Sequence, residues 1–181
     1  MVICVTGKIG SGKSEVSRII SKITGWKIVD VDEIGHEVLK MEDVKSKIVE
    51  TFGESILKGD EVDRKKLGEI VFSNEVLLRK LEEIVHPVMV RIAKERVKGL
   101  KNAIIDCALL KRMGLTDVCD FVITVVSSYE TALERKGIDE ERFRSIWGNQ
   151  EDVKMIGFVI ENEGSIEDLE RKVGDLLGMI L

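Results

Sequence analysis

Short apolar runs rich in β-branched residues alternate along the chain with longer segments in which apolar residues recur every three or four positions. The runs are typical of strands buried on both faces of a sheet, and the longer segments are typical of helices that connect parallel strands. This alternation predicts an α/β fold with a five-stranded parallel sheet. The expected strands cover residues 2–6, 27–32, 103–106, 121–126 and 158–160.

Two long stretches between the expected strands have helical spacing and contain no convincing strand. Pro87, the sole proline, fits the first turn of a separate helix, where its missing N–H costs no hydrogen bond. The layout predicts a core that is interrupted by a helical insertion and followed by a second, charged helical segment. The core covers residues 1–32 and 101–181, the insertion 33–100 and the second segment about 128–154.

Composition and charge indicate which kinds of binding partner are unfavourable for this chain. Of the 181 residues 44% are hydrophobic and 4% aromatic, and 28 basic against 33 acidic residues give a net charge of −5. A negative net charge and few aromatic side chains argue against nucleic acid and anionic membranes as partners. No apolar run reaches the roughly 18 residues of a membrane helix, and the N-terminus lacks the basic flank of a signal peptide. We therefore expect a cytoplasmic protein with no evident obligate protein partner.

The cysteines indicate no disulfide framework. Cys4, Cys107 and Cys119 are odd in number and widely spaced, and the chain has only two histidines. Neither a disulfide nor a structural zinc site is expected from this pattern. Each cysteine is expected to be a small buried apolar residue.

The strongest motif is a phosphate-binding loop that matches G-x-x-x-x-G-K-[ST] between the first expected strand and a helix. Glycines let backbone N–H groups point at a phosphate. A plain tight turn is the weaker interpretation, because all the fixed positions of the motif and both flanking elements agree. Lys13 would reach the β- and γ-phosphates of ATP, and the Ser14 hydroxyl would bind Mg²⁺. The expected ATP-binding residues of the loop are Gly7, Lys8, Ile9, Gly10, Ser11, Gly12, Lys13 and Ser14.

Three aspartates lie where expected strands end. Asp30 and Asp32 close the second strand and Asp106 closes the third. Ligands of open α/β sheets bind at this carboxyl edge. An aspartate there can orient an acceptor hydroxyl and take its proton, or organise a metal ion. The alternative for Asp30 or Asp32 is to cap a helix that begins near Glu33.

Four basic residues, Arg135, Lys136, Arg142 and Arg144, lie in the charged segment 128–154. In a phosphotransferase such a segment can close as a lid and place guanidinium groups on the transferred phosphoryl group. The alternative is a solvated charged face whose own acidic residues are the partners. With a phosphate loop in the same chain, we favour the lid.

The order of the motifs resembles dephospho-coenzyme A kinase over nearly the whole chain. The Asp-x-Asp, Asp-Arg, His-Pro and Val-Ile-x-Asn-x-Gly elements are more discriminating than the phosphate loop, which many families share. The resemblance implies a three-layer P-loop NTPase fold with a helical acceptor-binding insertion. It also implies transfer of the γ-phosphate of ATP, with Mg²⁺, to the ribose 3′-hydroxyl of dephospho-CoA, the last step of coenzyme A biosynthesis. The matching segments are 6–14, 29–34, 62–67, 71–72, 81–87, 105–110 and 159–164.

The resemblance also implies individual roles. Asp32 would be the catalytic acid/base, with Lys13 and the lid residue Arg135 stabilising phosphoryl charge. Asn162 would lie near the adenine. The residues expected on the acceptor side are Arg64 and His86 from the resemblance, together with Asp30 and Asp106 from their strand-end positions.

Some positions depart from the family pattern. Lys8 stands where the family usually has glycine, and Lys111-Arg112 stands where it tends to have Phe-Glu. The lid lacks an arginine that the family usually has three residues before Arg135. The spacing from Arg142 and Arg144 to Gln150 also differs from the family pattern, so which of these two arginines faces phosphate stays open.

Other functions are not excluded by the sequence. A phosphate-loop kinase with a nucleoside monophosphate or a sugar acid as acceptor would share most of these motifs. A nucleotide-dependent switch is a second alternative, because residues 32–35 satisfy the D-x-x-G pattern of GTPases, but no Asn-Lys-x-Asp element is present. A third is a catalytically inactive relative that serves as a scaffold.

Overall fold

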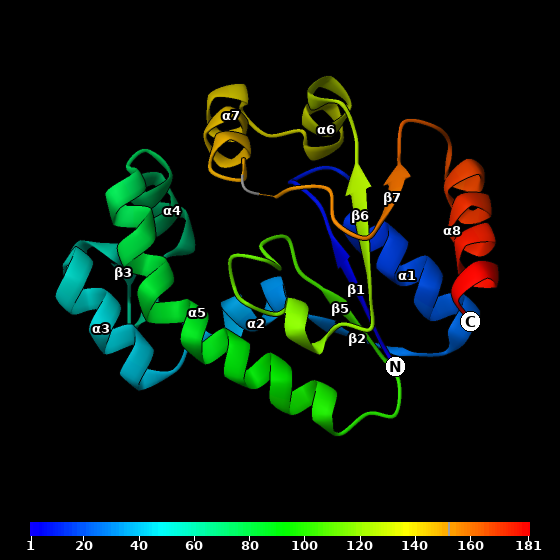
Figure 1. Cartoon of the computed structure of the whole chain (residues 1–181). Coiled ribbons are helices and arrows are strands. Elements are labelled where there is room, and N and C mark those ends of the chain that lie inside the picture. The colour runs from blue at the N-terminus through cyan, green and yellow to red at the C-terminus, as the bar shows by residue number, and fades with distance from the viewer. Residues whose placement is uncertain (152) are drawn as a thin grey trace.

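The computed structural model describes residues 1–151 and 153–181 and confirms the expected α/β fold (Figure 1). Five strands form one parallel sheet in the order β2-β5-β1-β6-β7. The second strand ends at Asp30, earlier than expected, because a helix begins at Val31. The strands are β1 (Val2–Thr6), β2 (Lys27–Asp30), β5 (Ala103–Asp106), β6 (Phe121–Val126) and β7 (Phe158–Glu161).

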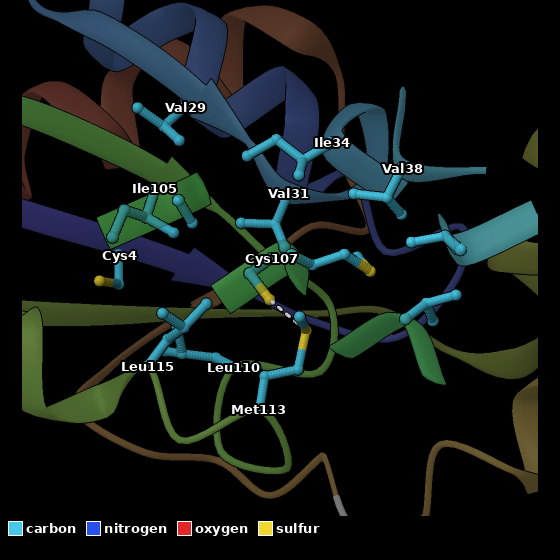
Figure 2. Packing of buried hydrophobic residues seen from close by; sticks show 14 of the residues in the cluster. Cys4, Val29, Val31, Ile34, Val38, Ile105, Cys107, Leu110, Met113 and Leu115 are labelled. Carbon is cyan, nitrogen blue, oxygen red and sulfur yellow. Dashed lines mark hydrogen bonds between the residues drawn. The ribbon is translucent and has the colours of Figure 1, made fainter. Parts of the chain in front are cut away.

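Helices cover both faces of the sheet. Helices α1 (Lys13–Thr24) and α8 (Ile166–Ile180) pack on one face, and α2 (Val31–Val38) and α5 (Glu75–Lys98) pack on the other (Figure 1). Each face carries its own hydrophobic cluster, the first under α1 and α8 and the second under α2 and α5. Side chains alternate between the faces along each strand, so Ile3 and Val5 belong to the first cluster and Cys4 belongs to the second. Figure 2 shows part of this second cluster, with Cys4 and Ile105 from the sheet and Val31, Ile34 and Val38 from α2.

Most of the remaining elements lie above and beside the carboxyl edge of the sheet, whereas the 3-10 helix before β6 lies at its amino edge (Figure 1). A hairpin of two-residue strands lies inside the segment 33–100, where no strand was expected. Strands this short leave no periodicity in the sequence. The elements are α3 (Glu42–Phe52), a 3-10 helix (Glu54–Ile56), β3 (Leu57–Lys58), β4 (Glu61–Val62), α4 (Arg64–Phe72), a 3-10 helix (Thr116–Val118), α6 (Tyr129–Lys136) and α7 (Glu140–Gly148).

Helix α5 runs through Pro87 without a break, so the prediction of a separate helix beginning at Pro87 is wrong. A proline inside a helix removes one hydrogen bond and costs about 3 kcal/mol. Leu78 and Val85 before the proline and Met89 and Ala93 after it are all buried on the same core. Packing of this continuous apolar face outweighs the local cost.

The lid helices α6 and α7 share a small aromatic core that the charge pattern of the segment does not reveal. Ring centroids of Tyr129 and Phe143 lie 5.2 Å apart, and that of Trp147 lies 5.5 Å from Tyr129 and 5.6 Å from Phe143. The Phe143 side chain is fully buried. The two helices are therefore held together by packing as well as by their connecting turn.

A disulfide joins Cys4 to Cys119, so the expectation of no disulfide is wrong. The sequence separation of 115 residues hides the proximity of the two cysteines. Strand β6 pairs with β1 in a register that places Phe121 opposite Ile3, which brings the segment before β6 next to Cys4. Cys107 is free and buried as expected, and burial raises the pKa of its thiol to about 12.

None of the helices in the described part of the chain combines the length and the apolar character needed to cross a bilayer.

The disulfide predicts a loss of stability when one of its cysteines is replaced. Replacement of Cys119 by serine should lower the free energy of unfolding by about 2–4 kcal/mol, because the cross-link restricts the unfolded chain. Urea denaturation of the wild type and Cys119→Ser without reductant measures the difference. In dithiothreitol the difference in unfolding free energy between the two proteins should shrink. Equal stability without reductant would show that the bond does not form.

Candidate active site

The phosphate-binding loop, residues 7–14, connects β1 to α1 and packs closely against the surrounding structure. Gly10 and Gly12 have φ angles of 76° and 94°, a conformation that favours glycine. A Cβ at Gly10 would lie 2.4 Å from the carbonyl oxygen of Ala132 in α6, and one at Gly12 would lie 2.2 Å from Nδ2 of Asn162. The loop therefore needs these glycines for its shape and also for its contacts with the lid and with the segment after β7.

The Lys13 ammonium lies between two carboxylates. Its Nζ is 2.7 Å from Oδ1 of Asp106 at the end of β5 and 2.8 Å from Oδ2 of Asp32 in the first turn of α2. Burial is the largest single influence on the pKa of Lys13 and acts to lower it, but the two negative charges together outweigh burial and raise this pKa above its usual value. The structure thus brings together Lys13, Asp32 and Asp106 from three separate segments of the sequence.

The oxygen atoms around Lys13 suit a magnesium nucleotide. The Ser14 hydroxyl lies 3.5 Å from the Lys13 ammonium, which is itself bonded to both carboxylates. Mg²⁺ typically binds one or two carboxylate or hydroxyl oxygens of the protein and completes its coordination with phosphate oxygens and water. The buried Ser11 hydroxyl, inside the loop, has no hydrogen-bond partner among the described residues. The ammonium and hydroxyl groups suit the phosphates of a polyphosphate, and the carboxylate and hydroxyl oxygens suit its divalent cation.

A cleft of about 820 Å³ extends from the loop between α5 and the lid. The phosphate loop and Asp32 line it, as do the apolar side chains Leu81 and Met89 of α5. Arg135 and Lys136 line the lid side. The volume and the mixed lining suit an organic substrate that carries phosphate groups.

His86 faces this cleft from α5 and lies close to an ion pair. Glu82 accepts from the Arg112 guanidinium at 2.7 Å, and both side chains are largely buried. Burial is the main cause that lowers the pKa of His86; the negative charge of Glu82 opposes it, and the positive charge of Arg112 lowers the pKa further. His86 is therefore poised as a neutral imidazole, which can donate and accept a hydrogen bond.

Of the four expected acceptor residues, only His86 lines this cleft. Asp106 is buried beneath it against Lys13, and Asp30 and Arg64 lie elsewhere. The Asp30 carboxylate accepts from the Glu33 N–H at 3.0 Å and caps α2, which agrees with the alternative interpretation of this residue. Arg64, at the start of α4, lines a separate hollow of about 600 Å³ together with His36 and Lys45. An acceptor role for Asp30 and Arg64 stays a prediction.

Asn162 and Arg135 form a chain of contacts to the loop. The Asn162 side chain donates from Nδ2 to the Ser11 carbonyl at 2.9 Å, and the Arg135 guanidinium donates to the Asn162 carbonyl at 2.9 Å. Asn162 is almost completely buried. The structure therefore places the expected adenine residue and the expected lid arginine on the same side of the phosphate loop.

The other two lid arginines point elsewhere. The Arg142 guanidinium lies against Gly68 of α4, and Arg144 pairs with Glu140 at 2.9 Å on the exposed face of α7. Lys136, in contrast, lines the cleft. Among the described residues, the lid side of the cleft therefore carries Arg135 and Lys136 and neither Arg142 nor Arg144.

Sequence reasoning missed the contacts of the segment that ends α7. The side-chain oxygen Oε1 of Gln150 accepts from the Ile9 N–H at 2.7 Å, and the Lys8 ammonium lies 4.8 Å from the centroid of a Trp147 ring. Single glutamine and tryptophan residues give no periodicity or motif. Two signals were available, the unusual lysine at position 8 and the place of Gln150 in the lid pattern of the resembled family.

Comparisons with known proteins agree with this geometry. The family described as dephospho-CoA kinase matches residues 1–168. Dephospho-CoA kinase of Fusobacterium nucleatum is 39% identical over 184 residues, which cover 96% of this chain and 95% of the relative. Dephospho-CoA kinase of Aquifex aeolicus is 37% identical over 181 residues, which cover 93% of this chain and 92% of the relative.

Solved structures are similar over the whole chain. Dephospho-CoA kinase from Campylobacter jejuni superposes with a TM-score of 0.69 at 26% identity and covers 99% of this chain and 96% of the other. The crystal structure of TT1252 from Thermus thermophilus gives a TM-score of 0.78 at 28% identity, with coverage of 100% and 98%. Together with the family match, these similarities show that the chain belongs to the dephospho-CoA kinase family.

Proposed function

We propose that the chain carries out the reaction of its family, ATP-dependent phosphorylation of dephospho-CoA, in the cleft between the phosphate loop, α5 and the lid. The observation that carries this proposal is the Lys13 ammonium held between Asp32 and Asp106 beside the loop. The group phosphorylated is the ribose 3′-hydroxyl, and Mg²⁺ accompanies ATP. Cytoplasmic location and independence from nucleic acid, membranes and other proteins stay predictions.

The phosphate loop holds ATP. Its backbone amides and the N-terminus of α1 bind the phosphates, with Lys13 exchanging its carboxylate partners for phosphate oxygens. The Ser14 hydroxyl would hold Mg²⁺, with Asp106 and Asp32 reaching it directly or through water. When held by these residues, Mg²⁺ would supply positive charge that neutralises the phosphate oxygens. Asn162, next to the loop, would lie near the adenine, and Arg135 would stabilise the phosphoryl group.

Asp32 is the proposed acid/base. Its side chain is 54% exposed, whereas that of Asp106 is only 2% exposed, so a substrate hydroxyl can reach Asp32 more readily. Asp32 orients the 3′-hydroxyl and takes its proton as the oxygen attacks the γ-phosphorus. The bond between the γ-phosphorus and the bridging oxygen breaks, and ADP leaves with that electron pair. Asp106, bonded to Lys13, organises the loop side of the same centre.

The acceptor enters from the α5 side. Leu81 and Met89 offer apolar contact to the acceptor base and ribose, and the neutral His86 offers a hydrogen bond. Arg64 in the neighbouring hollow is suited to a phosphate group of the same substrate. This arrangement separates the donor, on the loop, from the acceptor, on α5.

Replacement of Asp32 by asparagine tests the assignment of the base. The change keeps size and polarity but removes the proton acceptor, so kcat should fall by about 10²–10⁴-fold. ATP affinity should change little. Steady-state assay of coenzyme A formation and calorimetric titration with ATP measure the two effects.

The matched control for this variant is Asp117→Asn, which removes an exposed carboxylate that pairs with Lys94 at 3.0 Å outside the cleft lining. This control should keep the wild-type kcat. Near-normal turnover in Asp32→Asn would remove Asp32 from the mechanism. Product analysis in the same assay, with nucleoside monophosphates and sugar acids as competing acceptors, separates the proposed reaction from those of other kinases.

The protonation state of His86 gives a second test. Its pKa should lie below the value of about 6.5 for a free histidine. Because the unfolded chain then binds more protons than the folded chain, the folded protein should lose stability as the pH falls from about 6.5 through the lowered pKa of His86. An NMR titration of the imidazole signals measures this pKa, and His36→Gln assigns the remaining signal to His86. Glu82→Gln should lower the pKa further, and a pKa above 6.5 would contradict the burial argument.

A further inference from the structure

We propose that the end of α7, residues 147–150, is a docking segment that positions the first half of the phosphate loop for ATP, with Gln150 and Trp147 as positioning residues. This inference rests on the proposed binding of ATP at the loop. It concerns the coupling between the lid and the nucleotide, which the phosphate-loop motif does not specify.

The first contact is made by the backbone. The Ile9 N–H donates to Oε1 of Gln150 at 2.7 Å, and the next turn of the loop closes through the Ser11 N–H and the Lys8 carbonyl at 3.1 Å. A partly buried backbone amide needs a partner. Gln150 therefore fixes the orientation of the peptide that begins the loop's inward turn.

The second contact is made by the Lys8 side chain, at a position where the resemblance described above implies glycine. The Lys8 ammonium lies 4.8 Å from the centroid of a Trp147 ring and lines the cleft. A cation over an indole face is attracted by the negative charge of the ring's π-system, more strongly where water is excluded. Trp147 holds this positive charge at the cleft, whereas the usual glycine at position 8 would have no side chain to hold.

The docking segment is itself anchored on both sides. Trp147 belongs to the aromatic core with Tyr129 and Phe143, and the Asn149 carbonyl accepts from the Arg112 guanidinium at 2.5 Å. The segment is thus tied to α6 and to the loop after β5. Such a segment can transmit the position of the lid to the phosphate loop.

Coupling must act in both directions. If docking of residues 147–150 favours the loop conformation that binds ATP, bound ATP favours the docked lid by the same free energy. The lid then closes on the loaded loop in preference to the empty loop. Water is excluded when the γ-phosphate is present, which limits its loss to hydrolysis.

Two variants remove the contacts separately. Gln150→Leu removes the acceptor oxygen at similar size, and Trp147→Leu removes the aromatic face. Each should weaken ATP binding by about fivefold to thirtyfold, as expected for one hydrogen bond or one cation–π contact. Trp147→Phe, which keeps a weaker aromatic face, should recover part of the affinity.

The kinetic pattern distinguishes positioning from general damage. The KM for ATP should rise, while the KM for dephospho-CoA and the kcat at saturating ATP stay close to wild type. Glu151→Gln, which changes the next side chain along the chain, is the matched control and should bind ATP normally. Melting temperatures identify variants that fail to fold, in which case Gln150→Asn, too short to reach Ile9, replaces Gln150→Leu.

Fluorescence reports the Lys8–Trp147 contact without an activity assay. The chain contains only Trp26 and Trp147, so Trp26→Phe leaves a single emitter. In that background Lys8→Met should change the emission of Trp147 before any ATP is added, because the ammonium is removed from the ring.

Folded Gln150→Leu and Trp147→Leu variants that bind ATP as tightly as wild type would overturn the inference. So would Trp147 emission that is unaffected by Lys8→Met. A wild-type protein that binds ATP but does not phosphorylate dephospho-CoA would instead contradict the proposed function and leave the docking inference intact.

Discussion

The active-site structure depends on the pairing of one ammonium with two carboxylates. Lys13 comes from the phosphate loop, Asp32 from α2 and Asp106 from β5, and the parallel sheet brings these segments to one edge. A buried carboxylate and an exposed one so close together would repel each other without the lysine between them. In the proposed reaction, phosphate would take the place of these carboxylates on Lys13 and leave them free for Mg²⁺. One arrangement thus stabilises the empty site and prepares the loaded site.

The parts of this site that come from regular patterns were predictable from the sequence. The loop motif, the strand ends and the helix faces follow from spacing that the backbone geometry dictates. The Cys4–Cys119 bond and the Gln150 contact depend on which distant segments become neighbours, and spacing along the chain carries no such information. The prediction at Pro87 was wrong for a different reason. Proline prefers the first turn of a helix, but burial of apolar residues on both sides of Pro87 overrides this preference.

The lid shows how a chain poor in aromatic residues uses them. Of the described ring contacts, three join Tyr129, Phe143 and Trp147 within α6 and α7. The lid therefore has its own small core, although its sequence is dominated by charge. A rigid pair of helices can transmit a contact at one end, such as that of Trp147, to the whole lid.

The disulfide also divides the covalent structure into two parts. The bond between Cys4 and Cys119 closes a ring that contains the phosphate loop, α2 to α5 and β5, and it leaves β6, the lid, β7 and α8 as an open tail. A single peptide-bond cleavage anywhere inside this ring would not release a fragment. A protein nicked in the helical insertion would keep both halves of its active site on one covalent molecule until a reductant is added.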